Sequence, residues 1–225
     1  CCVLYGNRRG VSSLPTVSSR WGEPLITAFD VGYCAEENAA KGKNNDHTAP
    51  DHCEEAFTIT KRDGYLFDCV DLCIEEGSCT CILGPSISAS CLMNILAKRI
   101  APTEGTVQHH SGVRVGFCDS CYIDEMMSNV DEAITALEFL ARRYPKKTEK
   151  DIRGHLTAFG LSPASQAKTP LICLSGGETF RLAFSKIMLD DPPVIFLENP
   201  TSHLDVESVQ ALAYGMRQWN GTIVM

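Results

Sequence analysis

Apolar and polar positions alternate along the first half of the chain, with the period of two that is typical of strands. The alternation predicts a strand at Pro24–Cys34 and a pair of strands joined by a turn at Glu75–Gly77, in which Val70, Leu72 and Ile74 share one face. The second strand of that pair leads into a loop of small residues and then a helix. Two further strands complete the predicted sheet.

In the second half the apolar positions recur every three to four residues, which predicts amphipathic helices. Helices are predicted over Asn129–Pro145 and Thr148–Gly160, and a third begins at Glu178. An apolar strand at Val194–Leu197, a helix capped by Asp205 and a last short strand follow. Strands that alternate with helices predict an α/β fold with a mixed sheet.

The same patterns divide the chain into segments. We predict an N-terminal linker or arm at 1–23, one α/β domain at 24–225, a flexible insertion at 34–63 and a helical subdomain at about 124–167. The insertion is predicted because the segment from Ala35 to Asp63 is rich in Asn, Asp, Lys and His and has no apolar face to bury. The sequence begins at Cys1 and stops inside a predicted strand, so we expect it to be a fragment.

Composition restricts the class of protein. The chain has 225 residues, of which 44% are hydrophobic, and its formal charge of −8 repels nucleic acid and anionic lipid except at a local basic patch. No apolar run approaches the ~20 residues that span a bilayer, and no signal peptide precedes the Ser-rich start. We therefore expect a cytoplasmic protein without a membrane span.

Twelve cysteines raise the question of a metal site. Cys118 and Cys121 have the spacing of a zinc half-site, but no second pair matches it, so we favour reduced structural thiols. The stretch NNDHTAPDHCEE has the composition of a solvated loop, and we favour that reading over a metal site.

The loop after the strand Cys79–Leu83 has the frame of a phosphate-binding loop. That frame requires Gly at its first and sixth positions and then Lys and Ser or Thr. Here Gly84 is present, but Ala89, Ser90 and Cys91 occupy the other three positions. Taken alone, the loop is more often only a turn.

Two later motifs add to it. LSGGE, from Leu174 to Glu178, opens a helix whose backbone N–H groups can face a phosphate. VIFLENPTSHLD is a buried strand ending in the acid Glu198, where a carboxylate can meet a metal ion. The alternatives are a plain helix N-cap for the first motif and a plain turn for the second.

Together these motifs resemble an ATP-binding-cassette (ABC) ATPase, and the run from LSGGETFRLAFSKIML to NPTSHLDVESVQAL is similar in particular to the ABC-F class. The resemblance implies a P-loop NTPase core, ATP and magnesium as cofactors, and a chain truncated before the switch histidine. ABC-F proteins are soluble, carry two cassettes on one chain and act on ribosomes. The resemblance also implies that this chain is the second, degenerate cassette of such a protein. Its implied partners are the other cassette and ribosomal RNA.

The resemblance assigns a role to each matched residue. The adenine-stacking aromatic is Tyr33, and Ser120 takes the place of the Q-loop glutamine. The Walker A loop consists of Gly84, Pro85, Ser86, Ile87, Ser88, Ala89, Ser90 and Cys91, with Cys91 as a weak magnesium ligand. The signature consists of Leu174, Ser175, Gly176, Gly177 and Glu178. Glu198 stands for the magnesium-binding aspartate, Asn199 for the catalytic glutamate, and Asp205 for the D-loop aspartate.

The departures from the family pattern are concentrated in this chain's own ATP site. Lys, the hydroxyl ligand and the Q-loop Gln are absent, and Asn199 cannot accept a proton, a loss that typically costs ~10² to 10⁴ in rate. The signature and the D-loop are intact. Because each ATP in such proteins lies between one cassette's Walker A and the other's signature, we predict an inactive own site and a competent signature.

Two other functions stay open at this point. In one, Ser90 and neighbouring backbone groups still hold nucleotide and the domain is a working ATPase. In the other, the chain is the cytoplasmic cassette of a membrane transporter.

The basic cluster Ala141–Lys147 also has two interpretations. It is a solvated helix end whose cations complement the helix dipole, which we favour, or a contact to ribosomal RNA with Tyr144 stacking on a base.

Overall fold

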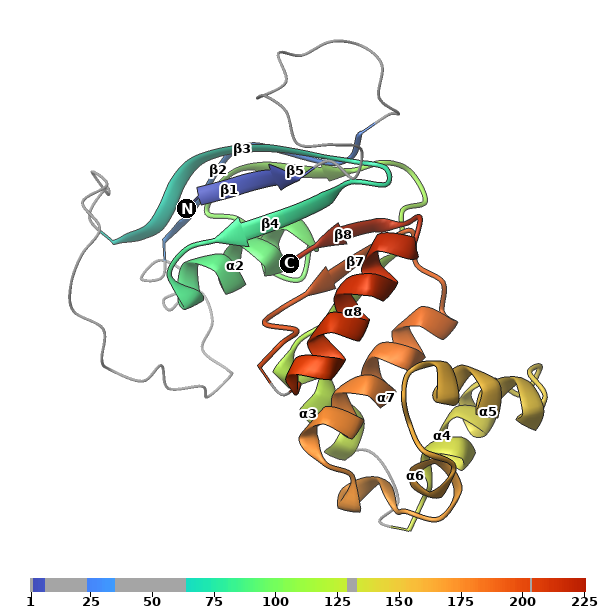
Figure 1. The fold of residues 1–225 in the computed structure, drawn as a ribbon. Coiled ribbons are helices and arrows are strands. Elements are labelled where there is room, and N and C mark those ends of the chain that lie inside the picture. Colours follow the sequence, from blue (N-terminus) through green and yellow to red (C-terminus); the bar gives the residue numbers. More distant parts are fainter. Residues whose placement is uncertain (1, 7–23, 35–63, 129–132, 203) are drawn as a thin grey trace. The chain divides into compact units, whose positions relative to one another are not determined.

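The computed structural model describes residues 2–6, 24–34, 64–128, 133–202 and 204–225 (Figure 1). The predicted insertion, apart from Cys34, and most of the predicted linker lie outside these residues. The chain divides into two compact units, which are treated separately. Unit 1 comprises residues 1–6, 11–76 and 80–112, and unit 2 comprises residues 7–10, 77–79 and 113–225.

Unit 1 contains a three-stranded antiparallel sheet in the order β3-β2-β5 (Figure 1). The elements of this unit are β1 (Cys2–Gly6), β2 (Pro24–Cys34), β3 (Tyr65–Glu75), β4 (Cys79–Leu83), α2 (Ser86–Leu96) and β5 (Glu104–His109). In the sheet Ala28 of β2 is opposite Leu72 of β3 and Val107 of β5. Helix α2 contacts this sheet, and its Ser88 hydroxyl donates to the carbonyl of Leu66 at 3.4 Å. Apolar residues of the strands and of α2 form the core of the unit.

Unit 2 contains a parallel sheet in the order β6-β7-β8 with helices α3, α7 and α8. The elements are β6 (Val115–Cys118), α3 (Ser120–Ser128), α7 (Gly176–Leu189), β7 (Val194–Leu197), α8 (Val206–Gln218) and β8 (Thr222–Val224). All four residues of β7 are buried, as its continuous apolar sequence predicts for a strand covered on both faces. The fully buried Leu182 and Ala183 of α7 belong to the same core.

Three short helices form the rest of unit 2, within the predicted helical subdomain. They are α4 (Ala136–Arg143), α5 (Glu149–Ala158) and α6 (Pro163–Ala167), and the one-turn helix η1 (Leu171–Cys173) connects α6 to α7. Capping boxes fix the first turns of α4 and α5: Thr135 pairs with Glu138, and Thr148 pairs with Asp151. Leu140, Ile152 and Leu156 are fully buried between these helices and α7.

The structure differs from the sequence predictions at several boundaries. The helix predicted from Asn129 begins at Ala136, because Thr135 caps it, and Ile134 is buried just before the cap. Helices α3 and α6 and the strand β1 were not predicted. None of the described helices is long and apolar enough to cross a membrane.

Candidate functional site: two helix N-termini

The first candidate site is the junction between β4 and α2 in unit 1. The strand ends at Leu83 and the helix begins at Ser86, so only Gly84 and Pro85 connect them. The amide of Ala89 donates to the carbonyl of Pro85 at 2.9 Å, the first bond of the helical ladder. The six predicted Walker A residues from Ser86 to Cys91 are therefore helical.

This geometry uses the amides of Ala89, Ser90 and Cys91 within the helix, whereas the amides of Ser86, Ile87 and Ser88 precede the first bond of the ladder. A phosphate-binding loop works because successive N–H groups point at the ligand. From Ala89 onward those groups donate to carbonyls of the preceding turn. Pro85 has no N–H to offer. The amide of Ser90 is therefore bonded within the helix, and the expectation that neighbouring amides hold phosphate rests on those of the first turn.

The side chains at this junction also do not suit MgATP. Leu83 is 46% exposed and Ile87 is 57% exposed, so the surface is apolar where a phosphate site is charged. Helix α2 has no side-chain cap at Pro85 and neither an acidic nor a basic residue in its terminal turns. The thiol of Cys91 is a poor substitute for the oxygen ligands that magnesium prefers.

Tyr33, the predicted adenine-stacking residue, lies on β2 in the same unit. Its ring is half-buried and stacks on Phe67 of β3, with ring centroids 6.2 Å apart and an interplanar angle of 23°. One face of the ring is thus covered by a neighbouring strand.

The second candidate site is the N-terminus of α7 in unit 2, where the LSGGE motif lies. Ser175 caps the helix: its hydroxyl accepts from the amide of Glu178 at 3.3 Å and donates to the Glu178 carboxylate at 2.9 Å. The same carboxylate accepts from the amide of Ser175 at 3.0 Å, which completes a capping box. The two remaining N–H groups of the first turn belong to Gly176 and Gly177, which have no side chain to obstruct a ligand.

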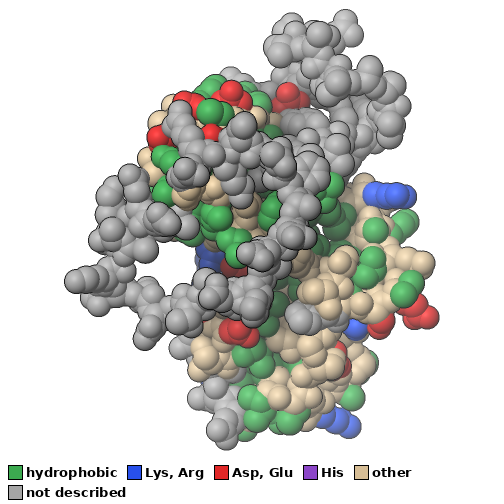
Figure 2. Space-filling model, turned by 90° about the vertical axis from the view of Figure 1, so that its left-hand side faces the viewer, with side chains coloured by type: hydrophobic (Ala, Val, Ile, Leu, Met, Phe, Trp, Pro, Cys, Tyr) green, Lys and Arg blue, Asp and Glu red, His purple; other side chains and the backbone are tan. Residues whose placement is uncertain are grey.

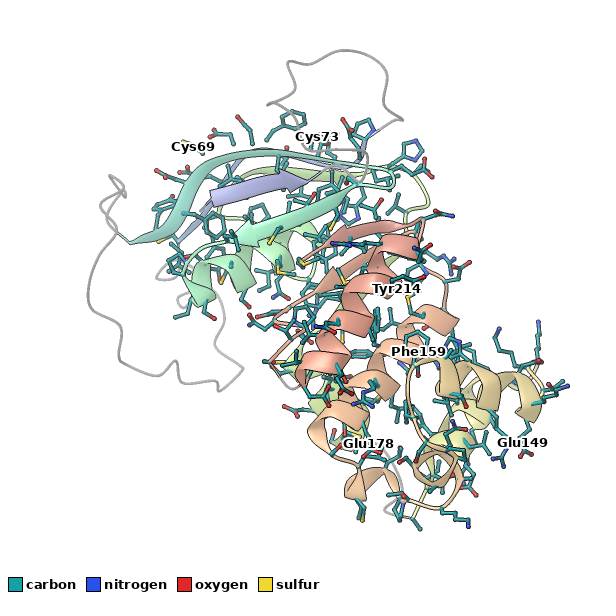
Figure 3. All side chains as sticks on the ribbon, in the orientation of Figure 1. Cys69, Cys73, Glu149, Phe159, Glu178 and Tyr214 are labelled. Atoms are coloured by element: carbon teal, nitrogen blue, oxygen red, sulfur yellow. The ribbon has the colours of Figure 1, made fainter. Side chains whose placement is uncertain are left out.

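Glu178 also joins this turn to α6 (Figure 3, labelled). Its other carboxylate oxygen accepts from the hydroxyl of Ser165 at 2.5 Å. This bond, followed by the bond from the Ser175 amide, lowers the pKa of Glu178, so the carboxylate stays ionised at neutral pH. The Glu178 carboxylate therefore joins the signature turn both to its cap residue, Ser175, and to α6.

Arg181, one turn further along α7, ties the same helix to its neighbours. One guanidinium nitrogen donates to the carbonyl of Gly160 at 3.1 Å and another to the hydroxyl of Ser208 on α8 at 3.1 Å. Helix α7 is thereby fixed against α8 and the end of α5.

The carboxyl ends of β6 and β7 carry three of the predicted residues. The two strands are parallel, and the amide of Glu198 donates to the carbonyl of Cys118 at 2.9 Å. Asn199 is exposed and has a positive φ of 47°, and its carbonyl accepts from the amide of Ser202 at 3.1 Å. Ser120 is the first residue of α3 and is also exposed. Asn199 is thus a turn residue in a conformation that Asn tolerates better than most.

Sequence reasoning missed Asp119, which is 94% buried at the end of β6 and accepts from the amide of Tyr122 at 2.7 Å. An Asp that directly follows a strand and precedes a helical segment is the signal that would have revealed this N-cap. Among the described residues no group of three or more His, Cys, Asp or Glu side chains could hold a metal ion. Cys118 of the CDSC motif is buried, and burial followed by the nearby Asp119 charge raises the pKa of its thiol to about 12.

Asp205, the predicted D-loop residue, caps α8. Its carboxylate accepts from the amide of Ser208 at 2.7 Å, and bonds from the amide and the side chain of Ser208 lower its pKa. Within unit 2, Glu198, Asn199 and Asp205 thus share the connection between β7 and α8.

A sequence profile of the ABC transporter family matches residues 67–202, which is more than half of the chain. The chain belongs to the ABC transporter family. This cassette is 33% identical over 157 residues to an uncharacterised ABC transporter ATP-binding protein of Schizosaccharomyces pombe, covering 69% of the chain and 21% of that relative. It is 28% identical to ATP-binding cassette sub-family F member 3 of Homo sapiens, covering 71% of the chain and 22% of the relative.

The ABC transporter F family member 4 of Arabidopsis thaliana is 30% identical and covers 76% of the cassette. The cassette spans about a fifth to a quarter of the length of these relatives. The predicted resemblance to the ABC-F class is confirmed by these sub-family F relatives.

A dimeric ATP-binding cassette solved in a post-hydrolysis state with ADP and Pi has a similar fold. The TM-score is 0.60 at 21% identity, covering 89% of this cassette and 86% of that chain. The predicted α/β fold with an ABC-type P-loop NTPase core is confirmed.

Proposed function

We propose that this cassette is the non-catalytic half of a twin-cassette ABC-F-like protein. Its own Walker A position does not hold ATP productively, and its signature turn completes the ATP site of the partner cassette. The observation that carries the proposal is the contrast between the two helix N-termini: that of α2 has no side-chain cap and is flanked by the exposed apolar side chains of Leu83 and Ile87, whereas that of α7 has a capping box and presents Gly176 and Gly177.

The residue at the catalytic position supports the same conclusion. Asn199 offers an amide, which cannot take a proton from an attacking water. It also occupies the left-handed region of backbone space, where a glutamate is strained. Ser120 has a short hydroxyl side chain, whose reach is less than that of the Gln that the family pattern has there.

The signature turn is suited to bind a phosphate. Bound in the partner's Walker A, MgATP supplies a terminal phosphate that carries negative charge. The Gly176 and Gly177 amides and the positive end of the α7 dipole would face that charge. Ser175 and Glu178 keep the turn in one conformation, so little ordering is needed when the two cassettes meet.

The wider setting belongs to the proposal as well. Likeness to the sub-family F relatives, of whose length this cassette covers less than a quarter, supports a second cassette on the same chain. The resemblance to the ABC-F class supports a cytoplasmic protein that acts on the ribosome.

The ATPase rate of the full-length protein containing this cassette tests the proposal. Ser175→Arg should lower this rate by ~10²-fold or more, because the large arginine side chain would occupy the space between the turn and the phosphate. Ser90→Ala should leave the rate within about twofold, since α2 takes no part in turnover.

Thr135→Arg is the matched control, because it removes the same kind of capping box from α4. If Thr135→Arg lowers the rate as much as Ser175→Arg, the signature effect is only a folding effect. A large loss with Ser90→Ala contradicts the inactive own site.

A further inference from the structure

The hairpin formed by the end of α4 and the first half of α5 carries an unusual concentration of positive charge. The segment 142–153 contains six cationic residues and two acidic ones, in a chain with a formal charge of −8. The cations are Arg142, Arg143, Lys146, Lys147, Lys150 and Arg153; we call this set the α4–α5 basic surface. All but Arg153 are exposed.

The two acids of the segment offset only part of the charge of this surface. Glu149 is bound by Arg153, whose guanidinium donates to it at 2.8 and 2.9 Å, and is labelled in Figure 3. Asp151 accepts from the hydroxyl and the amide of Thr148 in the α5 capping box. In the part of the chain that the structure describes, no carboxylate lies at ion-pair distance from Lys146, Lys147 or Lys150.

Tyr144 is held by its hydroxyl group, which makes the stacking role considered from the sequence less favourable. Its side chain is half-buried, and its hydroxyl donates to the carbonyl of Lys186 at 3.0 Å and to the carboxylate of Asp190 at 2.8 Å. Burial, followed by these contacts with Asp190, raises the pKa of the phenol. The hydroxyl of Tyr144 therefore anchors the hairpin to the C-terminal end of α7.

The composition of the surface selects the kind of partner. None of the exposed large hydrophobic side chains among the described residues lies in the segment 142–153, so an anionic membrane would find nothing to insert. Protein interfaces are depleted of Lys and are anchored by aromatic side chains, which this surface lacks. Single-stranded nucleic acid is bound by stacking as well as by charge. Exposed cations without stacking groups suit the phosphate backbone of a double helix.

We infer that the α4–α5 basic surface binds the phosphate backbone of double-stranded nucleic acid, independently of base sequence. This inference deepens the proposed action on the ribosome but does not depend on nucleotide binding by the cassette. The six cations are clustered within 12 residues of the sequence, whereas acidic side chains gather on another part of the surface, shown in red near the top of Figure 2.

Fluorescence anisotropy of a labelled 20-base-pair RNA duplex, titrated with the 225-residue chain at 50 to 300 mM NaCl, tests this inference. A parallel arm uses a DNA duplex of the same sequence, and a third uses anionic phospholipid vesicles. With three to four phosphate contacts, log K should fall with log salt with a slope of about −3. Lys146→Gln with Lys147→Gln should weaken duplex binding by about tenfold at low salt and reduce the slope by about 2.

Lys168→Gln with Arg217→Gln is the control that removes the same charge from exposed positions on α6's C-cap and α8. It should change the affinity by less than about twofold. Tyr144→Phe should leave the affinity unchanged.

Equal losses from both double variants, absence of duplex binding at 50 mM NaCl, or binding to vesicles but not to duplexes would each overturn the inference. RNA and DNA arms that agree support backbone recognition, and a preference for RNA adds recognition of the A-form shape. Because the signature role is tested separately by the ATPase rate of the full-length protein, failure here leaves that role intact.

Discussion

The N-termini of α2 and α7 are built from similar residues and have become different structures. Both follow a short turn and contain glycine and serine. Helix α7 has a serine cap, a glutamate at the third position and two glycines between them. The serine and the glutamate bond each other in a capping box, and the glycines have no side chain to obstruct a ligand. Helix α2 has proline at its cap and begins so early that its loop is reduced to Gly84 and Pro85.

The sixth position of the loop frame is one contribution to the difference. Glycine there favours a non-helical backbone, whereas Ala89 favours the helix by about 1 kcal/mol relative to glycine. Once Lys is also absent, no ligand contact opposes the helix. Replacement of residues that bind phosphate thus changes the backbone of this site as well as its charge.

The largest effect that we expect is on MgATP affinity, when the family residues are restored in α2. Ala89→Gly, Ser90→Lys and Cys91→Ser together should raise MgATP affinity by about ten- to a hundredfold, since a charge-assisted contact contributes roughly 1.5 to 3 kcal/mol. Calorimetric titration of the triple variant measures this. If affinity does not change, the backbone of α2, and not its side chains, blocks the site.

Removing the cap of α7 should cost more stability than the equivalent change in α2. Ser175→Ala should lower the free energy of unfolding by about 1 kcal/mol, because it leaves the amide of Glu178 without its acceptor. Ser86→Ala should change it by less than about 0.5 kcal/mol, because α2 has no side-chain cap. Urea denaturation of the two variants measures both values, and equal losses would mean that the capping box adds nothing.

Asn199→Glu tests whether the backbone at the predicted catalytic position accepts the family's glutamate. The positive φ of this residue makes glutamate unfavourable, so the variant should lose about 1 kcal/mol of stability, whereas Asn199→Gly should lose none. Thermal unfolding of both variants checks this. A stable Asn199→Glu variant would show that the turn can rearrange to accept the family residue.

The smallest expected effect concerns the packing of α5 against α7. Burial lowers the pKa of His155, whose ring nitrogen bonds the carbonyl of Ser185 at 2.9 Å. A histidine with a lowered pKa in the folded state stabilises the fold above its unfolded pKa of about 6.5, and this stability is lost as the pH falls through the folded pKa. Between pH 7.5 and 5, the wild type should therefore lose stability that His155→Gln does not lose. Urea denaturation at both pH values measures the free energy of unfolding. Equal losses in the wild type and in His155→Gln would contradict this.

Sequence alone predicted the elements whose signals are local. The strands Pro24–Cys34 and Val194–Leu197 appear as predicted, and Asp205 caps α8 as predicted. The helical state of Ser86 to Ala89 could not be predicted. The phosphate-binding pattern that begins at Gly84 predicts a loop there, and the helix propensities of these four residues are too weak to indicate otherwise. The inward position of Tyr144 depends on Lys186 and Asp190, which are distant in sequence and meet it only in the folded unit.

The roles of the site residues remain predictions, and one titration tests the central one most directly. MgATP added to the unmodified 225-residue chain in a calorimeter measures whether the α2 site accepts nucleotide. We expect a dissociation constant of about 1 mM or weaker, since the lysine is missing and the exposed side chains of Leu83 and Ile87 make the surface apolar, which leaves the phosphates only the first-turn amides of α2. Micromolar binding would contradict the inactive site and would favour a working ATPase.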